Sequence, residues 1–315
     1  MATTIAILVI GLIILIVGGD YLVRGSSSIA LRLHLSPLVV GLTIVAFGTS
    51  APELVISVQS ALKGSPDIAM GNVIGSNICN LALVLGLTSV ISPVKVQSNS
   101  IRIDWPMTMG ASILLYIMIR EGYLQGIEGM IMVVVLSIYL FFIIRQSRKN
   151  ILASKAESED EIPDAPPKQM WKDLVFILLG CVGLYYGSEW FVGSAKGLAL
   201  SLGVEERVVG LTVVALGTSL PELATAAVAS YKGQTDLALG NLMGSNIFNI
   251  LSILGITSII KDIHVHEIIL NKDIIWMLLI TLMILPLMII RREVGRVDGL
   301  ILLIVYAVYI YTVIV

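Results

Sequence analysis

Charge is scarce in this sequence. Asp, Glu, Lys and Arg make up 13% of its 315 residues, whereas a soluble domain carries about 25%. Hydrophobic residues make up 57%, and apolar stretches long enough to cross a bilayer as a helix, about 18 residues or more, recur along the chain. The low charge excludes an ordinary soluble protein. The apolar stretches predict an all-α membrane protein embedded in the lipid bilayer.

Cysteines, basic clusters and catalytic motifs are also scarce or missing. The two cysteines, Cys79 and Cys181, lie in different apolar runs, so the chain has neither a disulfide framework nor the spacing of a zinc site. No basic patch indicates a nucleic-acid partner. The sequence has no HExxH, no GxGD-type aspartyl motif and no Ser–His pair at membrane depth, so we predict that it is not an enzyme and needs no cofactor. Nothing points to an obligate protein partner.

The apolar runs predict ten transmembrane spans. The N-terminus lacks the basic segment and cleavage site of a signal peptide, so we interpret the first run as a retained span. With the N-terminus outside, 14 of the 20 Lys and Arg residues fall in cytoplasmic connections, as the positive-inside rule favours. We therefore expect a multi-pass protein of the cell (plasma) membrane with both termini extracellular. The predicted spans are residues 3–19, 38–62, 67–92, 105–119, 123–144, 172–193, 208–230, 237–260, 274–290 and 299–314.

A charged segment separates two halves of the chain. Residues 145–171 contain the run KAESEDEIPDAPPK, whose charge and proline content leave too little apolar surface for it to fold alone. We predict a cytoplasmic linker loop there. It would join a first five-helix repeat at 1–144 to a second at 172–315.

The two halves repeat each other at an offset of 169 residues. GLTIVAFGTSAPEL at 41–54 aligns with GLTVVALGTSLPEL at 210–223, and 27 of the 51 positions from 41 to 91 are identical to their counterparts at 210–260. Because each half has an odd number of spans, the second copy enters the membrane from the opposite side. The sequence therefore predicts ten transmembrane helices as two inverted-topology five-helix repeats, with a site near the midplane between them.

Two carboxylates lie deep within predicted spans, at Glu53 and Glu222. A charge at the bilayer centre costs about 2.5–3.5 kcal/mol on insertion scales, and no Lys, Arg or His lies at a matching depth. Each carboxyl group must therefore be protonated, face water or be neutralised by a bound cation. We favour a functional role over a structural one for this pair.

A proline precedes each of these glutamates. Pro52 and Pro221 have no amide hydrogen, so the carbonyl four residues earlier loses its helical partner. We expect a kink or a short unwound stretch around residues 46–50, with free carbonyls that face the protein interior. The hydroxyls that would join them as oxygen ligands of a hard cation belong to Thr49, Ser50, Thr218 and Ser219.

The next span of each half carries a polar face, because its asparagine and serine side chains recur every four residues. Their amide and hydroxyl oxygens are neutral cation ligands. For Asn72 and Asn241, hydrogen bonding between helices is an equally good explanation. The residues on this face are Asn72, Ser76 and Asn80 in the first half and Asn241, Ser245 and Asn249 in the second.

Other polar residues have simpler explanations. Asn77 and Asn246 lie about 100° around the helix from the polar face, so we assign them to packing. Asp20 and Glu189 align with each other and lie near predicted span ends, where we expect solvated or interfacial roles.

The paired motifs carry a family resemblance. GTSAPE with GNVIGSNICN, and GTSLPE with GNLMGSNIFN, are similar to the two alpha repeats of the sodium/calcium exchanger family, part of the cation/calcium antiporter superfamily. The resemblance covers nearly the whole chain. Its compact length is similar to that of archaeal and bacterial members, without the large regulatory loop of animal exchangers.

The resemblance implies which residues bind ions. It makes Glu53 and Glu222 the central Ca²⁺ ligands. Some members, including potassium-dependent ones, carry Asp at the position of Asn249, so the asparagine here argues against K⁺ dependence. The other ligands of Ca²⁺ and Na⁺ that it implies are Thr49, Ser50, Thr218, Ser219, Ser76, Asn80, Ser245, Asn249 and the carbonyls of Ala46 and Ala215.

The predicted function is a secondary antiporter that exchanges Na⁺ for Ca²⁺ by alternating access. Two carboxylates balance one Ca²⁺, and ions that share these ligands cannot occupy the site together. The resemblance implies that spans 1 and 6 slide against a core of spans 2, 3, 7 and 8. Two alternatives stay open. One is a Ca²⁺/H⁺ antiporter of the same superfamily, which typically has a GNxxE-type motif instead of GTSxPE, and the other is a passive cation channel.

Overall fold

The computed structural model describes residues 2–65, 67–157, 170–203 and 215–314. The α-helices are α1 (Ala2–Leu33), α2 (Pro37–Val40), α3 (Ala46–Thr49), α4 (Ala51–Leu62), α5 (Asp67–Ile78), α6 (Leu85–Ile91), α7 (Trp105–Met118), α8 (Gly126–Glu157), α9 (Met170–Ser201), α11 (Ala215–Gly217), α12 (Leu220–Tyr231), α13 (Thr235–Phe248), α14 (Gly255–Ile260), α15 (Ile274–Arg291) and α16 (Arg296–Ile314). Short π-helical segments continue several of these: η1 (Gly41–Val45), η2 (Cys79–Val84), η3 (Ser100–Asp104), η6 (Asn249–Leu254) and η7 (Ile269–Asp273). The remaining elements are a 3₁₀ turn η4 (Ile119–Glu121) and strands β1 (Val94–Lys95), β2 (Tyr123–Leu124), β3 (Ile263–His264) and β4 (Glu293–Val294).

Most of the predicted spans are present as helices. Within the described residues, seven helices are long and apolar enough to cross a membrane, or eight when the bent pair Pro37–Thr49 and Ala51–Leu62 counts as one span. The predicted span 105–119 is the shorter helix α7, which η3 extends toward its N-terminus. The predicted span 208–230 begins outside the described residues, and its described part contains α11 and α12.

Helices α1, α8 and α9 are longer than predicted. Each has 32 residues, whereas the apolar runs predicted 3–19, 123–144 and 172–193. In particular, α8 continues to Glu157, so the linker expected at 145–171 begins as a helix. The run RQSRKNILASKAE is rich in Ala, Lys, Arg, Gln and Glu, which favour helix even when they are polar. Residues 158–169 of the expected linker lie outside the described residues.

The core of the protein is formed by two central helical segments. The span Ile68–Ile91 is buried over 72% of its most apolar window and Thr235–Ile260 over 83%, against 17–33% in the other five long helices. Those peripheral helices expose large apolar side chains such as Ile13, Phe141 and Ile304. Such a surface is stable facing lipid, which indicates that the outer helices contact the bilayer.

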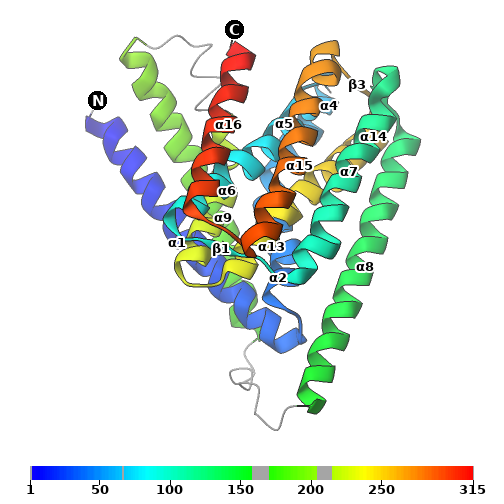
Figure 1. The fold of residues 1–315 in the computed structure, drawn as a ribbon. Coiled ribbons are helices and arrows are strands. Elements are labelled where there is room, and N and C mark those ends of the chain that lie inside the picture. The colour runs from blue at the N-terminus through cyan, green and yellow to red at the C-terminus, as the bar shows by residue number, and fades with distance from the viewer. Residues whose placement is uncertain (1, 66, 158–169, 204–214, 315) are drawn as a thin grey trace.

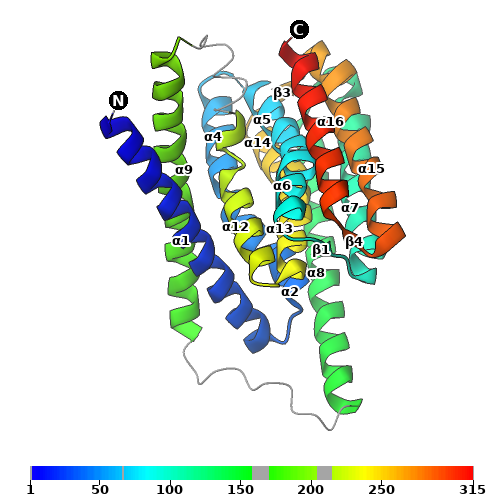
Figure 2. The ribbon, with the colours of Figure 1, turned by 60° about the vertical axis from the view of Figure 1, so that its left-hand side comes forward.

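The ends of the long helices divide the molecule into two poles. Helix α1 begins and α16 ends at one pole, whereas α8 ends and α9 begins at the other (Figures 1 and 2). Strand β1 pairs antiparallel with β4, and β2 pairs antiparallel with β3. The two pairs lie at opposite ends of α15, with β3 near the pole of the termini and β4 directly after the helix (Figure 1).

Helices α1 and α9 pack along each other through glycines. A Cβ added to Gly18 would come 2.8 Å from the backbone N of Leu184, and one added to Gly180 would come 2.6 Å from the N of Leu22. Since only glycine allows such an approach, the two helices form a tightly joined pair. Figure 2 shows this pair at the side of the bundle, apart from α15 and α16.

Candidate ion-binding site

Both GTSxPE motifs break their helices in the same way. The break between α3 and α4 falls at Ser50 (φ −88°, ψ 3°), and that between α11 and α12 ends at Ser219 (φ −91°, ψ 3°). The first break bends the span by 45°. Each proline then lies in the first turn of the new helix, where its missing amide hydrogen costs nothing. The kink predicted from Pro52 is thus confirmed, and Pro221 repeats it.

The break also leaves the carbonyl of a glycine without its helical partner. In the second copy, Ser188 of α9 donates a hydrogen bond to the carbonyl oxygen of Gly217 at 2.7 Å. The corresponding positions in the first copy are Gly48 and Gly19, and Gly19 has no side chain to donate. The repeated motif therefore has different surroundings in the two halves.

The two acids lie in the protein interior, in the first turns of α4 and α12. Glu53 and Glu222 are each 1% exposed. The N-terminal end of a helix favours a negative charge, and Ser50, three residues before Glu53, donates a hydrogen bond to Glu222. Two buried carboxylates away from water require compensation by a cation or a proton. Residues of both halves thus meet in the buried region that holds the acids.

Glu222 is held by residues of both halves. Ser50 donates to its Oε1 at 3.3 Å and Ser245 to the same oxygen at 3.4 Å. Thr49 continues this cluster, since its Oγ1 lies 3.3 Å from the Ser245 hydroxyl and 3.2 Å from Oδ1 of Asn241. The carbonyl oxygen of Ala46 is 3.3 Å from the same threonine hydroxyl. These predicted ligands therefore form one continuous cluster of oxygens.

The matching cluster around Glu53 is looser. Ser76 and Thr218 approach each other at 3.5 Å between hydroxyl oxygens, and the hydroxyl of Ser219 is buried without a hydrogen-bond partner. Ala215 begins α11 directly after residues outside the described part of the chain, and no described contact joins its carbonyl to the other predicted ligands.

Asn77 and Asn246 support the two site asparagines from the opposite half. The side-chain amide of Asn80 donates to Oδ1 of Asn246 at 3.3 Å, and that of Asn249 donates to Oδ1 of Asn77 at 3.1 Å. The packing role assigned to Asn77 and Asn246 is confirmed. In addition, these contacts orient the amides so that Oδ1 of Asn80 and of Asn249 is left without a donor.

Several buried oxygen atoms in this region have no hydrogen-bond partner. They come from both halves of the chain and can all accept, which is the ligand chemistry that hard cations require. Among the described residues, no group of three or more His, Cys, Asp or Glu gathers as a metal site, so any cation here would combine two acids with neutral oxygens. The atoms are both Oε of Glu53, Oε2 of Glu222, Oδ1 of Asn80, Oδ1 of Asn249 and Oγ of Ser219.

Asn72 and Asn241, for which two explanations stayed open, behave differently from each other. Asn241 is fully buried and contacts Thr49 in the cluster. Asn72 instead donates at 3.4 Å to Ser57, which follows Glu53 by about one turn of α4. Sequence could not separate them because both occupy the same GNxxGSN motif, and only the packing around each copy differs.

Comparisons with known proteins find chains that are similar to this one over nearly its whole length. The family model for sodium/calcium exchanger proteins matches residues 3–145 and 172–315. The chain is 38% identical to the proposed antiporter CaxA of Alkalimonas amylolytica over 99% of this chain and 98% of that protein. It is 30% identical to the sodium/calcium exchanger MaX1 of Methanosarcina acetivorans over 96% of each chain. The solved structure of the sodium-calcium exchanger NCX_Mj, soaked without Na⁺ and Ca²⁺, superposes with a TM-score of 0.84 at 30% identity, covering 98% of both chains.

Proposed function

Because this chain belongs to the sodium/calcium exchanger protein family, we propose that it exchanges Na⁺ for Ca²⁺ across the membrane by alternating access. Family and fold are those of secondary transporters rather than of enzymes. The observation that carries the proposal is that Glu53 and Glu222, one from each half, are both buried with unpaired oxygens, while Ser50 from the motif of Glu53 donates to Glu222.

The architecture that we propose is ten transmembrane helices as two inverted repeats, at 1–144 and 172–315. The positions of short elements support it. Strand β1 corresponds to β3 at an offset of 169 residues and β2 to β4 at 170, and the pair β1–β4 lies at the opposite end of α15 from β2–β3. The π-helical segments η3 and η7 also correspond at 169 residues. Equivalent elements at opposite ends are what an inverted repeat produces.

The binding centre that we propose uses the twelve predicted ligands, with Glu53 and Glu222 at its middle. One Ca²⁺ neutralises the two carboxylates. Several Na⁺ ions would use the same carboxylates together with hydroxyl and amide oxygens around them. Since both kinds of ion need the same two acids, they compete, and binding of one releases the other.

Charge explains why exchange would be coupled. Moving an empty centre with two ionised carboxylates through a low-dielectric interior is costly, whereas a loaded centre is close to neutral. The transporter therefore changes its open side only when ions are bound. A passive channel has no such requirement, so saturation and a need for a counter-ion distinguish the two.

The orientation that we propose places both termini outside the cell and the 145–171 connection in the cytoplasm of a cell (plasma) membrane protein. The distribution of Lys and Arg supports it. Helix α1 begins and α16 ends at the same pole, which is consistent with an even number of membrane crossings (Figure 2).

The test is a flux measurement in proteoliposomes. Ca²⁺ uptake is measured with an outward Na⁺ gradient, then with a pH gradient and no Na⁺, with membrane voltage clamped. We expect uptake that follows the Na⁺ gradient at constant pH. Uptake that ignores Na⁺ and follows the pH gradient would identify a Ca²⁺/H⁺ antiporter instead, and uptake without any counter-ion would identify a channel.

A further inference from the structure

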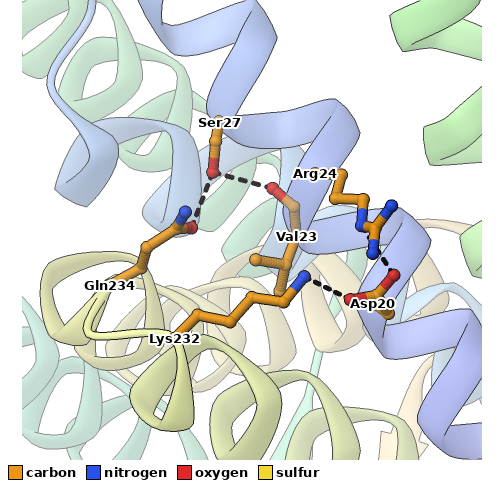
Figure 3. A network of polar contacts seen from close by, with 6 residues as sticks. All are labelled: Asp20, Val23, Arg24, Ser27, Lys232 and Gln234. Atoms are coloured by element: carbon orange, nitrogen blue, oxygen red, sulfur yellow. Dashed lines mark hydrogen bonds and ion pairs between the residues drawn. The ribbon is translucent and has the colours of Figure 1, made fainter.

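An ionic network ties α1 to the turn between α12 and α13. Asp20 pairs with Arg24 of its own helix, with 2.7 Å between Oδ2 and Nε, and its other oxygen contacts the ammonium of Lys232 in the turn (Figure 3). Ser27 of α1 lies 2.7 Å from Oε1 of Gln234 in the same turn. The contact between Asp20 and Lys232 is the part of this network in which opposite charges join two separate elements.

The repeat supplies a second pair with the same chemistry. At the offset of 169 residues, Asp20 corresponds to Glu189 of α9, and Lys232 corresponds to Lys63 at the end of α4. In the part of the chain that the structure describes, Glu189 and Lys63 form no ion pair with each other. The C-terminal ends of α4 and α12 lie at opposite poles (Figure 2). One of two equivalent pairs is therefore formed, and the other is open.

The side of the protein with the open pair is also more exposed than the side with the formed pair. Near Glu189, a cavity of about 240 Å³ is lined by Thr218 and Ile56, and Ile56 is 39% exposed. Their counterparts in the repeat are Thr49 and Thr225, which are 1% and 0% exposed.

Packing explains the closure beside Asp20. A Cβ on Gly19 of α1 would lie 3.2 Å from the carbonyl oxygen of Ala224 in α12, so α1 lies directly on that helix. Val55, the counterpart of Ala224 in α4, is 52% exposed. The closed ion pair thus accompanies a covered side of the candidate site, and the open pair accompanies a cavity that reaches Thr218.

We propose that Asp20–Lys232 and Glu189–Lys63 are alternative ion pairs, and that each forms in only one of the two access states of the transporter. These four are positioning residues: they set which side of the site is open and do not touch the ions. Because α1 and α9 are joined through glycines, a shift that separates Asp20 from Lys232 also moves Glu189. The proposal rests on the alternating access proposed above.

Each pair biases the equilibrium without locking it. The side chains of Lys232 and Asp20 are 28% and 23% exposed, and an ion pair that water reaches changes an equilibrium by roughly two- to fivefold. A transporter needs such a weak bias, because a stronger one would stop its cycle in one state.

The experiment measures accessibility of two equivalent positions. Cys79 and Cys181 are replaced by Ala, and Ile56→Cys or Thr225→Cys is introduced as the reporter. The purified protein in detergent micelles is labelled with a charged methanethiosulfonate, without any ion gradient. We expect the Ile56→Cys reporter to react and the Thr225→Cys reporter to be protected.

Neutralising one ion pair should shift the ratio of the two labelling rates in one direction, and neutralising the other pair should shift it in the opposite direction. Asp20→Asn or Lys232→Gln raises the labelling rate of the Thr225→Cys reporter and lowers that of the Ile56→Cys reporter, each by roughly two- to fivefold. Glu189→Gln or Lys63→Gln moves both rates the other way. The matched control is Arg24→Gln, which removes the other cation on Asp20 but no link between elements, and should not raise Thr225→Cys labelling.

Two further results decide the matter. The exchanged pair Asp20→Lys with Lys232→Asp should restore the original ratio, which separates loss of the ion pair from misfolding. Equal effects of Asp20→Asn and Arg24→Gln, or a shift in the same direction for Asp20→Asn and Glu189→Gln, would overturn the proposal. Because labelling uses no Na⁺ gradient, its result is independent of the flux assay. The ion-pair proposal can therefore fail while Na⁺-driven Ca²⁺ uptake is observed, or hold while that uptake is absent.

Discussion

Ser50 and Glu222, which come from opposite halves of the chain, are joined by a hydrogen bond of 3.3 Å. The serine belongs to the GTSAPE motif and the glutamate to GTSLPE. The first motif thus helps to position the acid of the second, so the second half cannot form the candidate site alone. Asn77 and Asn246 link the halves in both directions, because Asn249 donates to Asn77 and Asn80 donates to Asn246.

Neutralising either acid should abolish exchange. Glu53→Gln and Glu222→Gln remove one of the two charges that balance Ca²⁺, so we expect Na⁺-driven Ca²⁺ uptake to fall about 100-fold or more, the scale of breaking a buried ion pair. Radioactive Ca²⁺ uptake into proteoliposomes measures this. The control is Glu128→Gln in the first turn of the peripheral helix α8, where this partly exposed glutamate accepts from the backbone N–H of Gln125, and it should keep wild-type uptake. Robust exchange by either site variant would remove the ligand assignment.

Removing the Ser50 hydroxyl should weaken Ca²⁺ affinity. Ser50→Ala deletes one donor to Glu222 and one candidate ligand, and a hydrogen bond to a charged group contributes about 1.5–3 kcal/mol. We expect the KM for Ca²⁺ to rise by roughly tenfold or more while the protein stays folded. The control is Ser137→Ala on the exposed face of α8, whose hydroxyl bonds only the carbonyl of Val133. An unchanged KM in the Ser50 variant would argue against its role.

K⁺ should not be required for exchange. Two carboxylates neutralise one Ca²⁺, and with Asn at both 80 and 249 no third acid is available to balance K⁺ as well. We expect the rate of Na⁺-driven Ca²⁺ uptake to stay the same when K⁺ on both sides is replaced by N-methylglucamine. An uptake rate that rises with K⁺ concentration and then saturates would contradict this prediction, and would show that K⁺ binds here without a third acid.

The α1–α9 contact should be sensitive to added volume at one glycine and insensitive at another. Gly180→Ala places a Cβ 2.6 Å from the backbone of Leu22, and overpacking of this kind costs about 1–3 kcal/mol. We expect a lower thermal unfolding temperature in detergent. Gly193→Ala lies on the same helix with nothing within 4 Å, so it should leave the unfolding temperature unchanged or raise it. Equal behaviour of the two variants would contradict the close packing.

Much of the site could be predicted because its strongest signals are local. Proline lacks an amide hydrogen wherever it stands, so the breaks before Glu53 and Glu222 follow from Pro52 and Pro221 alone. The helix lengths were less predictable. Hydropathy marks the part of a helix that lipid can cover, but α8 extends beyond it as a polar helix to Glu157.

The sequence by itself determined that two equivalent buried acids, two helix breaks and two polar faces exist, because each depends on backbone chemistry or on the cost of charge in an apolar span. Only the tertiary structure decided that the copies differ. Thr49 and Thr218 stand in the same GTS triplet, yet Thr49 is covered and Thr218 lines a cavity. Identical local sequence cannot encode that difference, because it arises from where the joined helices α1 and α9 lie against the rest of the protein.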